Sequence, residues 1–221
     1  MRNSPIPTSP THITYRLYGS IPNLGLSNLH SAHRLRIAQL EETYTRDRIA
    51  SSATARKEYR EQLHQSELRC YLAYDNLLDR VSLGPRYLTS HAAKRIVIDS
   101  WLYIAKKYDL RLYAISVMSN HVHVLLDNNK AITKPLADIM AEHKRYTAFQ
   151  LNQLHGTKGR RVWAEKEYSR TVRFGNFERT LWYVLNNPVK AGLTDDPAGW
   201  FGNYFSEEMR RNFVEVRALA G

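Results

Sequence analysis

The sequence contains a single cysteine and no long apolar stretch, and both facts narrow its class. Cys70 is the one cysteine among 221 residues, so the chain can form neither an internal disulfide nor a cysteine-rich zinc site. No apolar run approaches the roughly 18 to 20 residues that a membrane-spanning helix needs. Residues 1–10 lack the apolar core of a signal peptide. We therefore expect a cytoplasmic protein that has no membrane partner.

Several common enzyme signatures are also missing. The sequence has no glycine-rich phosphate loop, no serine nucleophile elbow and no recognisable pair of catalytic carboxylates. It contains no internal repeat or low-complexity tract that would indicate a solenoid. With 43% hydrophobic residues the chain can bury one sizeable core, and we predict a single domain over residues 1–221.

Positive charge is what the chain has in excess. The formal net charge is +11 and the isoelectric point is about 9.8. A surface of this kind attracts polyanions at long range. Nucleic acid is the expected partner.

The order of predicted elements indicates an α+β fold. Residues 11–18 alternate between apolar and polar as a half-buried strand does, and residues 26–82 contain neither glycine nor proline, which favours a helical insertion. The later pattern predicts helices over 92–107, from Pro135 onward and over 177–187, with strands over 110–118, 121–127 and 169–174. This order suits a ferredoxin-like antiparallel sheet with helices on one face, plus the insertion at 26–82.

Two histidines lie two residues apart in the apolar strand 121–127. Side chains of a strand alternate between faces, so His121 and His123 leave the same face while Val122 and Val124 point to the other. Polar rings at such positions cost stability unless they are used. Two imidazoles supplemented by an amide or carboxylate oxygen would suit Mg²⁺ or Mn²⁺ better than structural zinc.

Two tyrosines could act beside such a metal. Tyr183 and Asn187 are four residues apart and share one helix face, so an amide oxygen on the metal would keep the phenol close to it. Tyr146 and Gln150 have the same spacing, although Tyr146 also continues an apolar stripe that starts at Ile139. Tyr168 has no such polar neighbour. The spacing alone leaves Tyr183 and Tyr146 as alternatives.

Two motifs resemble a known family. Residues 118–126 (MSNHVHVLL) resemble the HUH motif of single-tyrosine transposases, and residues 183–193 (YVLNNPVKAGL) resemble the tyrosine helix of their REP-associated branch. The resemblance extends to the strand at 11–17, to residues 84–126 and to Val162-Trp163. It implies that His121, His123 and Asn187 bind a divalent metal ion, Mg²⁺ or Mn²⁺, and that Tyr183 is the nucleophile, with both histidines counted among the catalytic residues.

The activity that this resemblance implies is cleavage and strand transfer of single-stranded DNA. The substrate would be a palindromic hairpin, the intermediate a 5'-phosphotyrosine, and no nucleotide cofactor would be needed. Basic side chains that could contact phosphates are Lys144, Arg145, Lys158, Arg160, Arg161, Arg170 and Arg173. The alternative is a domesticated protein that binds a DNA hairpin or a structured RNA without cutting it. The sequence is compatible with a monomer and with a homodimer.

Overall fold

The chain divides into two compact units. The computed structural model describes residues 6–80, 84–128 and 134–211. One unit combines Met1–Tyr18 with Pro85–Gly221, and the other is Gly19–Gly84. The helical insertion predicted over 26–82 falls in the second unit, and its residues 81 and 82 lie outside the described ranges. Within those ranges no helix is both long enough and apolar enough to cross a membrane.

The first unit is built on an antiparallel sheet. Its strands are β1 (Thr11–Arg16), β2 (Leu110–Val117), β3 (His121–Asn128), β4 (Tyr168–Thr171) and β5 (Asn203–Phe205). They lie in the order β4-β1-β3-β2-β5, which places β3 at the centre. The hairpin between β2 and β3 turns at Ser119-Asn120, as predicted, and is closed by the bond from Met118 N–H to His121 O (2.9 Å).

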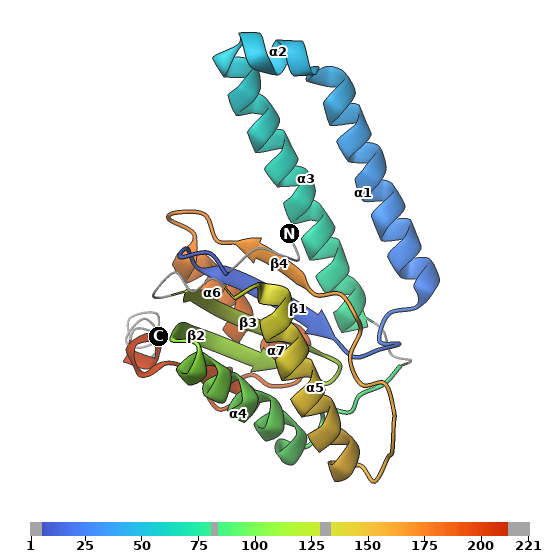
Figure 1. The fold of residues 1–221 in the computed structure, drawn as a ribbon, viewed down its shortest axis with the longest axis vertical. Helices are drawn as coiled ribbons and strands as arrows, with labels where there is room; N and C mark the ends of the chain where they lie inside the picture. The colour runs from blue at the N-terminus through green and yellow to red at the C-terminus, as the bar shows by residue number, and fades with distance from the viewer. Residues whose placement is uncertain (1–5, 81–83, 129–133, 212–221) are drawn as a thin grey trace. The chain divides into compact units, whose positions relative to one another are not determined.

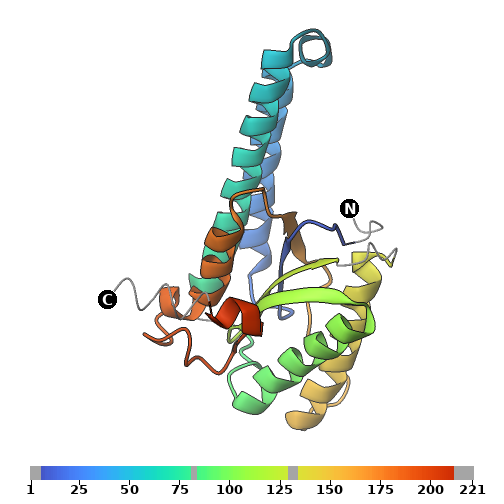
Figure 2. The same ribbon diagram turned by 90° about the vertical axis from the view of Figure 1, so that its left-hand side faces the viewer.

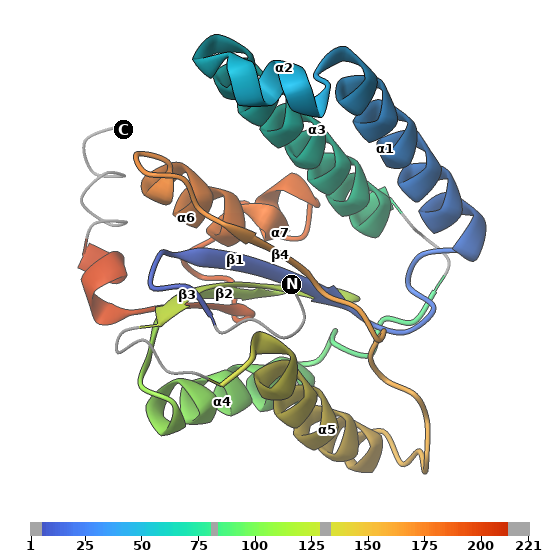
Figure 3. The same ribbon diagram turned by 45° about the horizontal axis from the view of Figure 1, so that its top comes forward.

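Helices cover both faces of this sheet. The helices α4 (His91–Lys107) and α5 (Leu136–Leu154) pack on one face, and α6 (Phe177–Leu185) and α7 (Asn187–Lys190) lie on the other (Figure 3). Val122 and Val124 belong to the larger core beneath α4 and α5. Leu125 belongs to the smaller core beneath α6. The predicted α+β class is confirmed, and α6 and α7 add a layer that the sequence pattern did not predict.

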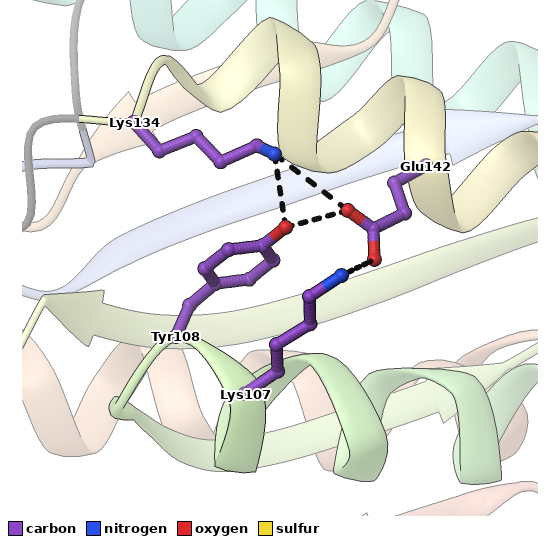
Figure 4. A network of polar contacts seen from close by, with 4 residues as sticks. All are labelled: Lys107, Tyr108, Lys134 and Glu142. Carbon is purple, nitrogen blue, oxygen red and sulfur yellow. Dashed lines mark hydrogen bonds and ion pairs between the residues drawn. The ribbon is translucent and has the colours of Figure 1, made fainter.

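Two polar networks fix α4 and α5 against each other and against the sheet. At the end of α4, Lys107 and the Tyr108 hydroxyl both contact the Glu142 carboxylate on α5, and Lys134 Nζ donates to the Tyr108 hydroxyl (Figure 4). Deeper in the core, His143 Nε2 lies 2.7 Å from the Tyr15 hydroxyl of β1. Its other nitrogen, Nδ1, lies 2.9 Å from Ser100 Oγ of α4. Burial lowers the pKa of His143 to about 3, so this imidazole is neutral at physiological pH.

The short strand β5 is held by a buried lysine and a glycine. Lys94 of α4 donates from Nζ to Val117 O (2.7 Å), and its ammonium lies 4.4 Å from the Trp200 ring centre. Val117 N–H donates in turn to Gly202 O (2.8 Å). A Cβ atom at Gly202 would lie only 2.5 Å from Val117 O, so this close approach requires glycine. Burial lowers the pKa of Lys94 to about 7.

The second unit is a pair of long helices. α1 (Asn23–Thr43) and α3 (Ala53–Arg80) run side by side and are joined by the short helix α2 (Arg46–Ser51) (Figures 1 and 2). Thr45 caps α2 by accepting a hydrogen bond from Arg48 N–H (3.4 Å). Burial raises the pKa of the Cys70 thiol, which makes it a poor nucleophile. The prediction of helices in this region is confirmed.

Candidate functional site

The two motif histidines lie on the face of the sheet that α6 covers. Val122 and Val124 are buried in the core on the opposite face, as the alternation along β3 predicted. The rings of His121 and His123 lie with their centres 4.8 Å apart, and one nitrogen of each comes within 4.8 Å of the other. Both side chains are almost completely buried. The pair therefore presents two nitrogens to one small volume.

Hydrogen bonds fix the orientation of both rings. His121 Nδ1 lies 2.7 Å from Asn120 Oδ1. His123 Nδ1 lies 3.1 Å from Thr14 Oγ1 and 3.2 Å from His12 Nε2. Because Nδ1 is engaged in each ring, Nε2 is the atom suited to binding a metal.

The electrostatics around His123 favour a neutral imidazole. The pKa of His123 is well below its usual value, first because the ring is buried and then because His121 and Lys190 add positive charge nearby. A histidine must be neutral to bind a metal ion. At neutral pH no proton has to leave His123 before it can do so.

Tyr183 of α6 reaches this cluster. Its ring centre lies 6.2 Å from that of His123, with the two planes at 90°, and 5.9 Å from that of His12. The residue is half-buried, and Lys190 Nζ lies 5.8 Å from the centre of its ring. Leu181, Val184 and Leu185 of the same helix are buried in the smaller core and anchor α6 on this face of the sheet. The predicted nucleophile and the predicted ligand His123 are thus neighbours.

Asn187 lies just beyond the helix that carries Tyr183, which corrects one boundary. The helix predicted to end at Asn187 ends at Leu185, because Pro188 has no N–H with which to continue it. The Asn187 side chain instead donates from Nδ2 to Tyr183 O (2.8 Å) and Val184 O (3.4 Å). Asn187 is 1% exposed, and its Oδ1 accepts no hydrogen bond from the residues described. A buried amide oxygen without a donor is suited to a cation.

The structure places the rival Tyr146 away from the histidines and Tyr168 on their face of the sheet. Tyr146 and Gln150 lie on α5, on the opposite face of the sheet from the histidines (Figure 3). The expectation that Tyr146 packs in the core is wrong: it is 52% exposed, because the buried stripe of α5 passes through Thr147 and Leu151 instead. Tyr168 of β4 is paired with Thr14 of β1, so its side chain lies on the same face of the sheet as the histidines. β4 is separated from β3 by β1.

One of the seven basic candidates for DNA contact is already engaged. Lys144 Nζ lies 3.2 Å from Ala164 O, 3.0 Å from Glu165 O and 2.7 Å from Glu167 Oε2. These acceptors match the three N–H groups of an ammonium. Lys144 is therefore the weakest of the seven candidates for a phosphate contact.

Four others lie on the α5 side of the sheet. Arg145, Arg160 and Arg161 line a cavity of about 430 Å³ between α5 and the segment that leads to β4, and Lys158 is exposed in the preceding loop. The guanidinium of Arg160 lies 3.7 Å from the Tyr87 ring centre, and that of Arg161 lies 4.2 Å from the Tyr18 ring centre. Aromatic rings thus preorganise two of these cations.

The remaining two lie near the other face. Arg170 of β4 is paired with His12, so it stands on the histidine face of the sheet. Arg173 is exposed in the turn before α6. The predicted basic residues therefore fall into two groups, one on the α5 side of the sheet and one on the side of the histidines. Arg170 and Arg173 form the second group.

Sequence reasoning missed three residues that the fold brings to the site: His12, Thr14 and Lys190. The alternation along residues 11–18 did place His12 and Thr14 together, opposite Ile13 and Tyr15. That alternation could not predict that β1 pairs with β3, and this pairing sets Thr14 directly opposite His123. Lys190 lies three residues after Asn187, and only the turn of α7 brings it back to Tyr183.

Comparison with known proteins agrees with this geometry. Residues 86–186 match the model of the family "Transposase IS200 like", a segment that contains His121, His123 and Tyr183 and stops just before Asn187. The family resemblance that the motifs indicate is thereby confirmed.

One solved structure is similar to this fold over almost the whole chain. It is the REP-associated tyrosine transposase bound to a REP hairpin, with a TM-score of 0.51 and 12% identity, over 98% of this chain and 85% of that chain. At this identity the similarity establishes the fold. No curated protein matches the chain.

The residues of the site fit a metal ion. Two imidazole nitrogens that are held by hydrogen bonds and lie within 4.8 Å of one another can bind one divalent cation and leave positions for other ligands. His121 and His123 can therefore bind a metal ion, and Asn187 is the candidate for a third ligand.

Proposed function

We propose that the protein is a transposase that cuts and rejoins single-stranded DNA at palindromic hairpins, with Tyr183 as the nucleophile and with Mg²⁺ or Mn²⁺ bound by His121, His123 and Asn187. One observation carries the proposal: the Tyr183 ring lies against the His123 ring within a segment that matches the IS200-like transposases. Packing of the Tyr183 ring does not require the buried imidazoles of His12 and His123 beside it, so their presence supports a chemical role.

In the proposed reaction the Tyr183 hydroxyl loses its proton and its oxygen attacks the phosphorus of the scissile phosphate. The bond from phosphorus to the 3' oxygen breaks, the departing oxygen takes up a proton as a free 3'-hydroxyl, and a 5'-phosphotyrosine remains. The bound cation would neutralise charge on the phosphate oxygens. Attack by the 3'-hydroxyl of another strand on the phosphotyrosine reverses these steps and releases the tyrosine, so cleavage and joining share one site.

The remaining residues hold this geometry. Asn187 is hydrogen-bonded to the carbonyl oxygen of Tyr183, so a shift of the amide shifts the backbone of the nucleophile with it. Lys190 places a cation beside the phenol, where it would favour developing negative charge on the tyrosine oxygen and on the phosphate. Arg170 and Arg173 are the basic residues best placed to guide the strand towards them.

The choice of substrate is supported by charge and by the structural neighbour. A chain with a net charge of +11 attracts nucleic acid, and the neighbour of the same fold is described as bound to a REP hairpin. We extend that substrate class to this protein, as a hairpin with single-stranded flanks. The protein would act as a monomer or a homodimer and would need no nucleotide cofactor.

The proposal is tested with an end-labelled DNA hairpin that carries single-stranded flanks. We expect cleavage with Mn²⁺ or Mg²⁺, none with EDTA, and a fall of at least about 100-fold in His121→Ala and in His123→Ala. His155→Ala is the matched control, because His155 lies beyond α5 and contacts Tyr87 O (3.0 Å) rather than the site. It should cut like the wild type.

Two results would count against the proposal. Undiminished cutting by the His121→Ala, His123→Ala double variant would remove the pair from the mechanism. Tight hairpin binding without any cutting would favour the alternative of a domesticated binding protein, and tighter binding of an RNA hairpin of the same sequence would favour an RNA partner.

A further inference from the structure

We propose that His12 of β1 is a positioning residue that holds the metal ligand His123 and the nucleophile Tyr183 in register. The inference rests on the proposed function and adds a residue to it. His12 lies outside both sequence motifs and outside the segment that matches the family model, which begins at residue 86.

The geometry places His12 between the two groups. Its Nε2 lies 3.2 Å from His123 Nδ1, and the two rings are stacked with centres 5.4 Å apart and planes 30° apart. Its ring also meets the Tyr183 ring edge-on, with centres 5.9 Å apart and planes 72° apart. His12 is 1% exposed, so its ring is enclosed by protein rather than by solvent.

The chemistry of the ligand explains why such a neighbour is needed. A neutral imidazole that binds a cation through Nε2 carries its proton on Nδ1, and a buried N–H must find an acceptor. His12 Nε2 and Thr14 Oγ1 are the two candidate acceptors at His123 Nδ1. His121 is served by Asn120 Oδ1 in the same way.

His12 differs from Thr14 in what else it does. The Thr14 hydroxyl can accept a hydrogen bond from His123. The His12 ring can also accept one, and in addition it stacks on the His123 ring and so opposes rotation of that side chain. The same ring bounds the space in which the phenol of Tyr183 can turn. Loss of His12 should therefore disturb both metal affinity and the placement of the nucleophile.

The test separates the hydrogen bond from the ring. His12→Phe keeps an aromatic ring beside Tyr183 and removes the acceptor. His12→Gln can place its amide oxygen near the position of Nε2, whereas the shorter side chain of His12→Asn cannot reach it. Thr14→Val removes the other acceptor. Mn²⁺ affinity of the full chain is measured by the electron paramagnetic resonance signal of free Mn²⁺, alongside hairpin affinity and thermal unfolding.

We expect His12→Phe and His12→Asn to weaken Mn²⁺ binding by about 10-fold to 100-fold, while hairpin affinity is retained. His12→Gln should stay within about threefold of the wild type, as expected when an acceptor is restored. The pair of amides keeps the test valid even if His12→Phe does not fold. Wild-type Mn²⁺ affinity in His12→Asn, or a loss in His12→Gln as large as in His123→Ala, would overturn the positioning role.

The outcomes also distinguish this inference from the proposed function. If the wild type itself binds no Mn²⁺, or if His123→Ala binds it equally well, the proposed metal site fails. If the wild type binds Mn²⁺, His123→Ala does not, and the His12 variants behave as the wild type, only the role of His12 fails.

Discussion

At the scale of single residues, the amide of Asn187 joins the proposed metal site to Tyr183, the proposed nucleophile. Its nitrogen is fixed by the backbone oxygens of Tyr183 and Val184, and the bond of 2.8 Å to Tyr183 O leaves the amide oxygen to point away from the helix end. That oxygen is buried and accepts no hydrogen bond from the described part of the chain. Such a group costs free energy unless a ligand satisfies it.

Asn186 offers a matched control for this role. Its side chain also donates to a helix-end carbonyl, Trp182 O at 2.9 Å, but it is not a predicted ligand. We expect Asn187→Ala to raise the Mn²⁺ concentration needed for half-maximal cleavage by at least about tenfold, and Asn186→Ala to leave it unchanged. Cleavage rates measured across a Mn²⁺ series decide between them, and an equal effect of the two substitutions would reduce Asn187 to a helix cap.

At the scale of elements, most helices and strands of the first unit could be predicted from the sequence. Regular alternation predicted β1, proline and glycine marked the helix ends, and the two-residue turn at Ser119-Asn120 predicted the hairpin of β2 and β3. Two features escaped. β5 is three residues long, too short for any period, and it is set by the contacts of Lys94 and Gly202. α6 covers its face of the sheet by packing on the smaller core, which includes Tyr113, Leu125 and Phe205, and no local pattern encodes that contact.

The site shows the same limit. The histidine pair, Tyr183 and Asn187 could be named because each stands in a local motif. His12 and Thr14 could not, since their proximity to His123 depends on the register of β1 against β3, more than 100 residues away in the chain. Spacing alone also left Tyr146 as a rival, and only the placement of α5 on the opposite face of the sheet excludes it.

The buried His143 makes a prediction about acid stability. Its pKa is about 3 in the folded chain, against about 6.5 for an exposed histidine. Because the unfolded chain gains this proton first, the stabilising contribution is complete above pH 6.5 and is lost as the pH falls towards 3. Between pH 7 and pH 5 the loss amounts to about 2 kcal/mol.

Urea unfolding of the wild type and of His143→Gln measures this contribution. Glutamine can still accept a hydrogen bond from the Tyr15 hydroxyl but does not titrate, so the variant should lose about 2 kcal/mol less than the wild type between pH 7 and pH 5. Equal losses in the two proteins would mean that His143 takes up its proton without unfolding.

At the scale of the whole molecule, the positive charge is concentrated in one unit. Residues 19–84 contain nine basic and eight acidic residues, so they contribute +1 to the net charge of +11. The unit that carries the histidines and Tyr183 contributes the rest. The field that attracts polyanions therefore originates in the unit with the candidate site, and the paired helices α1 and α3 add little to it.

This distribution predicts how binding depends on salt. The logarithm of affinity for a flanked hairpin should fall linearly with the logarithm of salt concentration, by about 0.7 for each phosphate contacted on a single strand. Arg173→Ala and Arg145→Ala should each reduce that slope by about 0.7, whereas Lys144→Met should leave it unchanged because Lys144 is bound to Glu167. Fluorescence anisotropy across a salt series measures the slopes. Equal affinity for a plain duplex would show that the substrate class is wrong.

The central claim is that Tyr183 becomes covalently joined to DNA, and one measurement tests it most directly. The wild type, Tyr183→Phe, Tyr146→Phe and Tyr168→Phe are each incubated with end-labelled hairpin DNA and Mn²⁺, denatured in detergent, and examined for labelled protein. Phenylalanine keeps the ring and deletes only the hydroxyl, so folding and DNA affinity should persist. We predict an adduct in the wild type, in Tyr146→Phe and in Tyr168→Phe, and none in Tyr183→Phe. An adduct that persists in Tyr183→Phe and disappears in Tyr168→Phe would contradict the account and move the nucleophile to β4.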